Sequence, residues 1–185
     1  MFHWREEVGM HRSISPRDMD RRRARLRRQA TEAWARRLAN AQYGMMSIHA
    51  ILPVFQEWMT RRHGSLSFRT TQILTGHGCF GKYLCRIGKQ PNAACHHCDC
   101  EEDTAQHTLE SCPAWTAERD ALRAMVGSDL SLPIVVGAMC EREDVWMAVL
   151  SFCDAVMSQK ESAERDRERR NPVRRRARRR GRRVT

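Results

Sequence analysis

The stretch ACHHCDCEEDTAQHTLESCPAW, residues 94–115, holds four cysteines and three histidines in 22 positions. Its best-spaced ligand set is Cys95, Cys98, His107 and Cys112, in the pattern C-x2-C-x8-H-x4-C. Structural zinc sites use four such thiolate and imidazole ligands at tetrahedral corners. Because the polar residues between the two pairs cannot build a core, we expect zinc to fix this loop as a zinc knuckle. The alternative is a coincidental group of buried or free thiols.

The other cysteines and histidines fit the metal less well. Cys100 would strain a chelate with Cys98, so we expect it to be free. His96 and His97 lie inside the C-x2-C turn and are expected to point away from the metal, with base stacking or phosphate contact as the alternative role. Core positions on helical apolar faces are expected for Cys79, Cys85, Cys140 and Cys153. Because four protein ligands leave no open position for water, we expect the metal to be structural rather than catalytic.

Outside this stretch, apolar residues recur every three or four positions, which predicts helices rather than strands. Helices are expected over 18–43, 53–64, 66–78, 79–88, 113–127 and 144–170. The apolar segment 131–139 fits either a strand or a helix. Within 18–43 the apolar residues Leu26, Ala30, Ala33/Trp34 and Leu38 recur at three-to-four spacing. Buried positions are expected at Leu66, Phe68, Ile73 and Leu74. Gly44 is expected to end the first helix, Pro53 to open the second, and 158–170 to extend outward as an exposed helix.

The fold class expected is all-α: a helical bundle-like domain with one zinc-knuckle loop and flanking arginine-rich disordered arms. The expected segments are a poorly ordered N-terminus (1–16), a helical region (17–92), the CCHC zinc knuckle (93–114), a second helical region (115–168) and an arginine-rich disordered tail (169–185). His77, in the motif T-G-H-G, is expected to cap a helix or to pack between helices.

Basic charge is concentrated toward the two ends of the chain. Residues 17–37 carry nine arginines against three acids, and residues 169–185 carry ten arginines and no acid. The body, 38–168, holds twelve basic and seventeen acidic groups. Guanidinium groups match phosphate oxygens bidentately, which predicts nucleic acid as the partner of at least one arm. A solvated tail or a nuclear-import signal is the alternative interpretation.

The eight cysteines fit either a disulfide-rich secreted protein or a reduced metal-binding one. The segment MFHWREEVGMHR lacks the apolar core of a signal peptide, and the sequence has no run of about 18 apolar residues. We therefore expect reduced cysteines, a nuclear and/or cytoplasmic location, and no membrane partner.

Two blocks beside the cysteine-histidine stretch resemble a known family. These are WMTRRHGSLSFRTTQILTGHG (58–78) and LTGHGCFGKYLCRIGK (74–89), followed by the ligand pattern and CPAW (112–115). Together they resemble the C-terminal region of non-LTR retrotransposon polyproteins, most of all the type-1 clade that inserts into arthropod ribosomal RNA genes. In that family this helical segment follows an endonuclease and a reverse transcriptase, and it ends in a CCHC zinc knuckle.

The resemblance implies a fragment that binds template RNA or target DNA during target-primed reverse transcription. The parent polyprotein would be an RNA-directed DNA polymerase with endonuclease activity. No polymerase aspartate turn and no endonuclease residue set can be assembled from these residues, so we expect that this chain alone is not an enzyme. The alternative hypothesis is a zinc-stabilised docking element that packs on the polymerase domain, because the acidic DCEED segment would repel phosphate.

Phosphate contacts are expected from basic residues near the knuckle and in the tail. Lys82, Arg86 and Lys89 are spaced to share one helical face that leads into the knuckle, with an ordinary solvated face as the alternative. Trp115 either stacks on a base or packs in the core. The full set of expected contacts is Arg61, Arg62, Lys82, Arg86, Lys89, Arg174, Arg175, Arg176, Arg178, Arg179 and Arg180.

Overall fold

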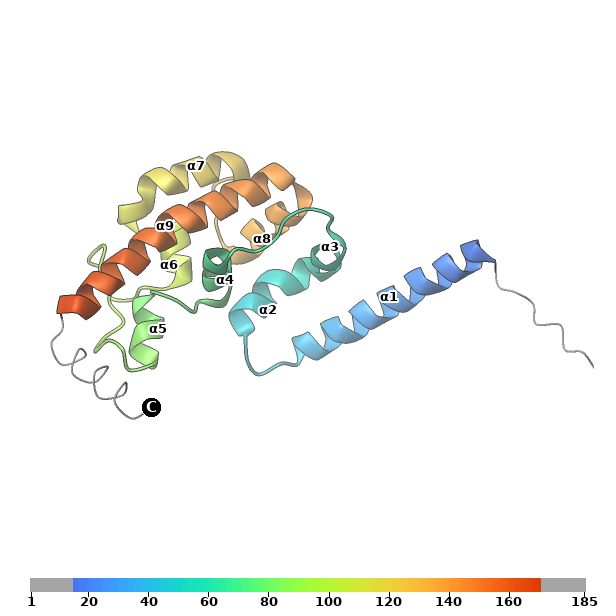
Figure 1. Ribbon diagram of the computed structural model, residues 1–185, viewed down its shortest axis with the longest axis horizontal. Helices are drawn as coiled ribbons and strands as arrows, with labels where there is room; N and C mark the ends of the chain where they lie inside the picture. Colours follow the sequence, from blue (N-terminus) through green and yellow to red (C-terminus); the bar gives the residue numbers. More distant parts are fainter. Residues whose placement is uncertain (1–14, 171–185) are drawn as a thin grey trace, which may run out of the picture.

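The computed structural model describes residues 15–170, and all regular secondary structure within them is helical (Figure 1). The elements are α1 (Pro16–Ala39), α2 (Met45–Ile51), the 3-10 turn η1 (Leu52–Val54), α3 (Phe55–Thr60), α4 (Phe68–Thr75), α5 (Gly81–Arg86), α6 (Ala105–Glu110), the 3-10 turn η2 (Pro113–Trp115), α7 (Thr116–Val126), α8 (Leu132–Glu141) and α9 (Glu143–Arg170). The all-α fold class is thus confirmed for this part of the chain. None of these helices is both long enough and apolar enough to cross a bilayer.

Helix α9 is the spine of the bundle, and α4, α7 and α8 pack along it (Figure 1). Its inner face carries Trp146, whose ring is fully buried and whose indole N–H donates to the Ser65 carbonyl at 3.1 Å. Gly64, with φ 79°, lies so close that a Cβ there would sit 2.2 Å from the Trp146 ring. This turn therefore requires glycine for both its backbone conformation and its packing.

The buried apolar residues of α9, called here the α9 stripe, are Val145, Trp146, Val149, Phe152, Cys153, Val156 and Met157. The buried hydrophobic cluster runs from the α9 stripe into the cysteine-histidine stretch without a break. Cys95, Ala105, Leu109 and Cys112 belong to the same cluster as Trp146. Residues of all three expected segments, 17–92, 93–114 and 115–168, thus contribute to one core.

Helix α1 stands apart from this bundle (Figure 1), and none of its residues is buried. It meets the bundle at η1 and α3, and at α3 the Trp34 and Phe55 ring centroids are 5.5 Å apart in an edge-to-face contact. Leu26 and Trp34, which belong to the apolar repeat of this helix, are 55% and 50% exposed. The apolar spacing of α1 reflects an amphipathic helix whose apolar face is largely uncovered within residues 15–170.

Helix boundaries differ from expectation around residues 40–60. Asn40 ends α1, whereas Gly44, expected to end it, has φ 71° and precedes α2 instead. Helix α2 was not expected at all, and Pro53 lies inside η1 rather than opening a helix.

Two apolar residues, one before α4 and one at its start, are exposed although they were expected to be buried. Leu66 and Phe68 are 38% and 75% exposed, whereas Ile73 and Leu74 are buried as expected. The ambiguous segment 131–139 is helical and forms most of α8.

The arginine-rich and charged segments are helical where the structure describes them. Residues 17–37 lie within α1, and residues 158–170 complete α9. The expectation that 158–170 is an exposed extension is wrong, because Lys160 and Glu164 are buried. Residues 171–185 of the arginine-rich tail and residues 1–14 of the N-terminus lie outside the described residues.

Candidate metal centre

Local hydrogen bonds place the four expected ligands. Cys95 and Cys98 lie in the loop between α5 and α6, where the Cys95 amide donates to the Cys100 carbonyl at 2.9 Å and closes the turn. Thr104 caps α6 by accepting from the His107 amide at 2.9 Å. The Cys112 amide donates to the His107 carbonyl at 2.8 Å, which turns the chain back after α6. The C-x2-C turn and the end of α6 therefore face each other.

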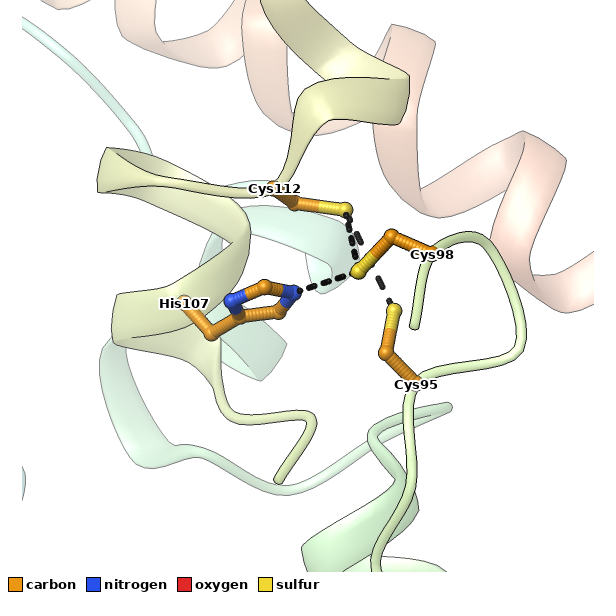
Figure 2. A group of neighbouring side chains, drawn as sticks. All are labelled: Cys95, Cys98, His107 and Cys112. Atoms are coloured by element: carbon orange, nitrogen blue, oxygen red, sulfur yellow. Dashed lines mark hydrogen bonds between the residues drawn. The ribbon is translucent and has the colours of Figure 1, made fainter. Parts of the chain in front are cut away.

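The four donor atoms meet at one point (Figure 2), all within 4.8 Å of one another. The Cys112 sulfur lies 3.8 Å from the Cys98 sulfur and 3.9 Å from the Cys95 sulfur. The Cys98 sulfur lies 3.3 Å from Nε2 of His107. Metal–sulfur bonds of about 2.3 Å at tetrahedral angles place sulfur atoms about 3.8 Å apart. The group Cys95, Cys98, His107 and Cys112 can therefore hold a metal ion.

Neighbouring groups orient the ligands from outside. Nδ1 of His107 lies 3.1 Å from the Ser111 hydroxyl, which leaves Nε2 facing the thiols. Such a contact on the far ring nitrogen is how proteins fix a metal-binding imidazole. Arg119 of α7, only 3% exposed, donates through Nε to the Leu109 carbonyl at 2.9 Å and through Nη2 to the Cys112 carbonyl. Arg119 thus ties α7 to the chain reversal that carries Cys112.

Burial decides the protonation of the group without metal. It raises the pKa of the Cys95 thiol, and it raises the pKa of the Cys112 thiol to about 12. Burial also lowers the pKa of His107, so its imidazole is neutral near pH 7. A metal could therefore bind the neutral imidazole directly, but it would have to displace protons from the thiols.

Sequence reasoning missed a second group that holds the loop, the buried ion pair of Asp103 and Lys160. Nζ of Lys160 lies 2.8 and 2.9 Å from the two Asp103 carboxylate oxygens, with side chains 1% and 3% exposed. Asp103 also accepts from the Gly81 amide at 3.0 Å. Asp103 is therefore buried, unlike Glu101 and Glu102 of the same acidic segment, which are exposed. The sequence feature that could have indicated the burial of Lys160 is its position three residues after Met157, which continues the spacing of the α9 stripe.

The remaining residues of the stretch have separate contacts. Cys100 is exposed, and its thiol points to the Glu102 carbonyl at 3.6 Å. His96 hydrogen-bonds the Gln90 side chain at 2.9 Å. His97 packs its ring against Trp115 with centroids 4.9 Å apart, and burial lowers the pKa of His97 to about 4. Trp115 is 3% exposed, so it packs in the core.

The expected phosphate contacts fall into different environments. Arg61 is half-buried, and its guanidinium lies 4.2 Å from the Trp58 ring centroid and 4.8 Å from that of Trp146. Arg62 is exposed. This packing leaves Arg61 less accessible to a phosphate than Arg62.

The three basic residues expected on one helical face do not share it. Lys82 and Arg86 lie on α5, but that helix ends at Arg86, and Gly88, with φ 69°, turns the chain before Lys89. Lys82 pairs with Glu102 at 2.8 Å, and Lys89 pairs with Glu168 at 3.5 Å. The tail candidates lie outside the described residues: Arg174, Arg175, Arg176, Arg178, Arg179 and Arg180.

Comparison with known proteins gives one informative relative. Over 109 residues the chain is 31% identical to the Retrovirus-related Pol polyprotein from type-1 retrotransposable element R1 4 of Nasonia vitripennis. The match covers 56% of this chain and 26% of the relative, so the chain spans about a quarter of the length of the curated relative it matches. No family model and no solved structure matches the chain. As its motifs predict, the chain resembles part of a type-1 retrotransposon Pol polyprotein.

Proposed function

We propose that Cys95, Cys98, His107 and Cys112 bind one zinc ion with a structural role. Three thiols and one imidazole form a donor set that favours zinc over the harder divalent ions, which prefer oxygen ligands. Four protein ligands complete the tetrahedral shell, so the metal has no open position for a substrate. The observation that carries this proposal is the convergence of four donor atoms within 4.8 Å.

Arg119 fits the charge of such a centre. A divalent ion with three thiolates carries a net charge of −1, and the guanidinium of Arg119 is buried beside Cys112 with its hydrogen bonds directed to backbone carbonyls. A buried cation needs a compensating negative charge nearby. The zinc-bound thiolates would supply that charge.

We further propose that this zinc-stabilised module binds RNA or DNA, positioning template or target during target-primed reverse transcription by its parent polyprotein. The likeness to a Pol polyprotein supports a nucleic-acid partner. Helix α1 supports it as well, because residues 17–37 carry nine arginines against three acids and the helix buries none of its residues. Exposed Arg62 and Arg86 add basic groups on the bundle itself.

A second candidate function is docking on the polymerase domain of the parent. The uncovered apolar side chains favour it, since Trp34 is 50% exposed and Phe68 is 75% exposed. The exposed acids Asp99, Glu101 and Glu102 also make the outer edge of the metal loop a poor phosphate surface.

Binding of the zinc-loaded chain to labelled single-stranded RNA and duplex DNA across a salt series separates the two. A nucleic-acid module should bind with log affinity falling linearly against log salt, by about 0.7 to 0.9 for each phosphate contacted. Removing zinc with a chelator should weaken this binding, and the affinity that remains should be that of the arginine-rich segments alone. Absence of salt-dependent binding in the full chain would refute the nucleic-acid role and leave docking as the function.

A further inference from the structure

A cavity of about 370 Å³ opens between α5, the first turn of α6 and the turn after α4. Its volume lies within the range of small-molecule sites. Its floor is apolar, with Met46 and Phe80, and its rim is polar. The rim residues that carry the argument are His77, Lys82, Tyr83, Arg86, Thr104 and Gln106.

The T-G-H-G motif builds one wall of this cavity. Gly76 ends α4 with φ 66°, and a Cβ there would lie 2.9 Å from the Met46 sulfur, so the turn requires glycine. This tight turn places His77 against Tyr83 of α5, with ring centroids 4.8 Å apart and planes inclined by 31°. His77 remains exposed, so the ring stack reaches the surface at the rim of the cavity.

Basic groups flank the aromatic pair. The guanidinium of Arg86 lies 5.0 Å from the Tyr83 ring centroid, and Arg86 is exposed. Lys82 is also exposed, in a surface ion pair with Glu102 that contributes little and can be exchanged for another anion. Stacking rings beside exposed cations form the arrangement that binds single-stranded nucleic acid, whose bases stack while the phosphates contact the cations.

The opposite wall belongs to the metal loop. Asp103 accepts from the Gly81 amide at 3.0 Å, and its carbonyl accepts from the Lys82 amide at 3.0 Å. The next residue, Thr104, caps α6, and Gln106 lies in the first turn of that helix. The Thr104 hydroxyl accepts from the His107 amide and can still donate its own hydrogen, while the Gln106 side-chain amide donates to the Leu130 carbonyl at 3.4 Å and retains its carbonyl oxygen as an acceptor. These two groups can hydrogen-bond the edge of a flat heterocycle. The chain segment that follows the C-x2-C turn therefore holds both sides of the cavity at a fixed separation.

We propose that this cavity receives one unpaired nucleobase of a single-stranded RNA or DNA, stacked at His77 and Tyr83, with Arg86 contacting a flanking phosphate. The proposal rests on the nucleic-acid function proposed above and names the substrate class, an unpaired strand. A base inside a duplex is stacked and paired, so it cannot enter the cavity without being extruded.

The test compares a twelve-nucleotide single-stranded RNA with a strand of the same length and charge built from abasic nucleotides. The zinc-loaded full chain should prefer the base-bearing strand by about tenfold, the effect of one stacked base. His77→Ala should remove most of this preference. His49→Ala, the same substitution at an exposed histidine of α2 that does not line the cavity, should retain it. Arg86→Ala should weaken binding of both strands alike.

Each contrary result has a distinct meaning. Equal binding of the two strands by the unsubstituted chain, or an unchanged preference in His77→Ala, would overturn the base pocket while leaving general phosphate binding intact. No binding of either strand at low salt would overturn the nucleic-acid function and the base pocket together.

Discussion

Replacing buried Lys160 with methionine should destabilise the fold far more than replacing a lysine of an exposed ion pair. Both Asp103 carboxylate oxygens lie within 2.9 Å of Nζ, and the two side chains are 1% and 3% exposed. Methionine keeps most of the volume of the lysine stem, so packing changes little. The substitution instead leaves the Asp103 carboxylate buried without its cation.

Loss of one partner of a buried ion pair costs about 3–5 kcal/mol. With a urea dependence of about 2 kcal/mol per molar, the unfolding midpoint should fall by about 2 M. Asp103 lies in the metal loop and also accepts a hydrogen bond from the Gly81 amide. Because the substitution disturbs the position of this loop, zinc affinity should fall together with stability.

The assay is urea unfolding of the zinc-loaded chain followed by circular dichroism. The matched control is Lys89→Met, which removes a lysine from an ion pair with Glu168 whose side chains are 48% and 23% exposed. Such a surface pair contributes about 0–1 kcal/mol. The double substitution Asp103→Asn with Lys160→Met keeps an acceptor for the Gly81 amide and removes the stranded charge. It should therefore be more stable than Lys160→Met alone.

Equal destabilisation by Lys160→Met and Lys89→Met would refute this reasoning. It would mean that the ion pair does not hold the metal loop on α9, and that the hydrophobic contacts of the loop are sufficient.

Other perturbations test the remaining parts of the account. Cys98→Ser or His107→Ala should make residues 90–115 sensitive to limited proteolysis, whereas Cys100→Ser, at an exposed thiol, should not; equal resistance of all three variants would count against a metal-fixed loop. Zinc affinity should fall as pH falls between about pH 8 and pH 6, because the metal must displace protons from thiols that burial keeps protonated, with the pKa of Cys112 raised to about 12. Competition with a chromophoric chelator measures this dependence, and a flat profile would contradict thiolate ligation. Deleting residues 169–185, which carry ten arginines, should weaken nonspecific nucleic-acid binding at low salt without changing the helical circular dichroism signal. Unchanged low-salt affinity would argue against the tail as a contact.

The ligand group was predictable because its signal is local. The spacing of Cys95, Cys98, His107 and Cys112 defines two chelating pairs, and a polar loop needs something other than a core to fix it. The helical character of most segments was predictable for a similar reason, since Ile73, Leu74 and the α9 stripe follow the 3.6-residue period.

The features that the sequence did not predict are those that depend on contacts between distant parts of the chain. Asp103 and Lys160 are 57 residues apart in the chain, so neither sequence neighbourhood reveals that they meet. The period of Leu26 and Trp34 is genuinely helical, but periodicity does not show whether a partner covers the apolar face. The cavity beside Tyr83 is lined by residues of α2, α4, α5 and α6, and composition and spacing do not encode how these elements come together.

Metal content of the chain purified under reducing conditions tests the central claim most directly. The account predicts one zinc per chain, retained in Cys100→Ser and lost in Cys98→Ser, because only the second substitution removes a donor from the group that converges within 4.8 Å. A chain that folds without zinc, or a Cys98→Ser variant that binds zinc as tightly as the unsubstituted protein, would contradict it.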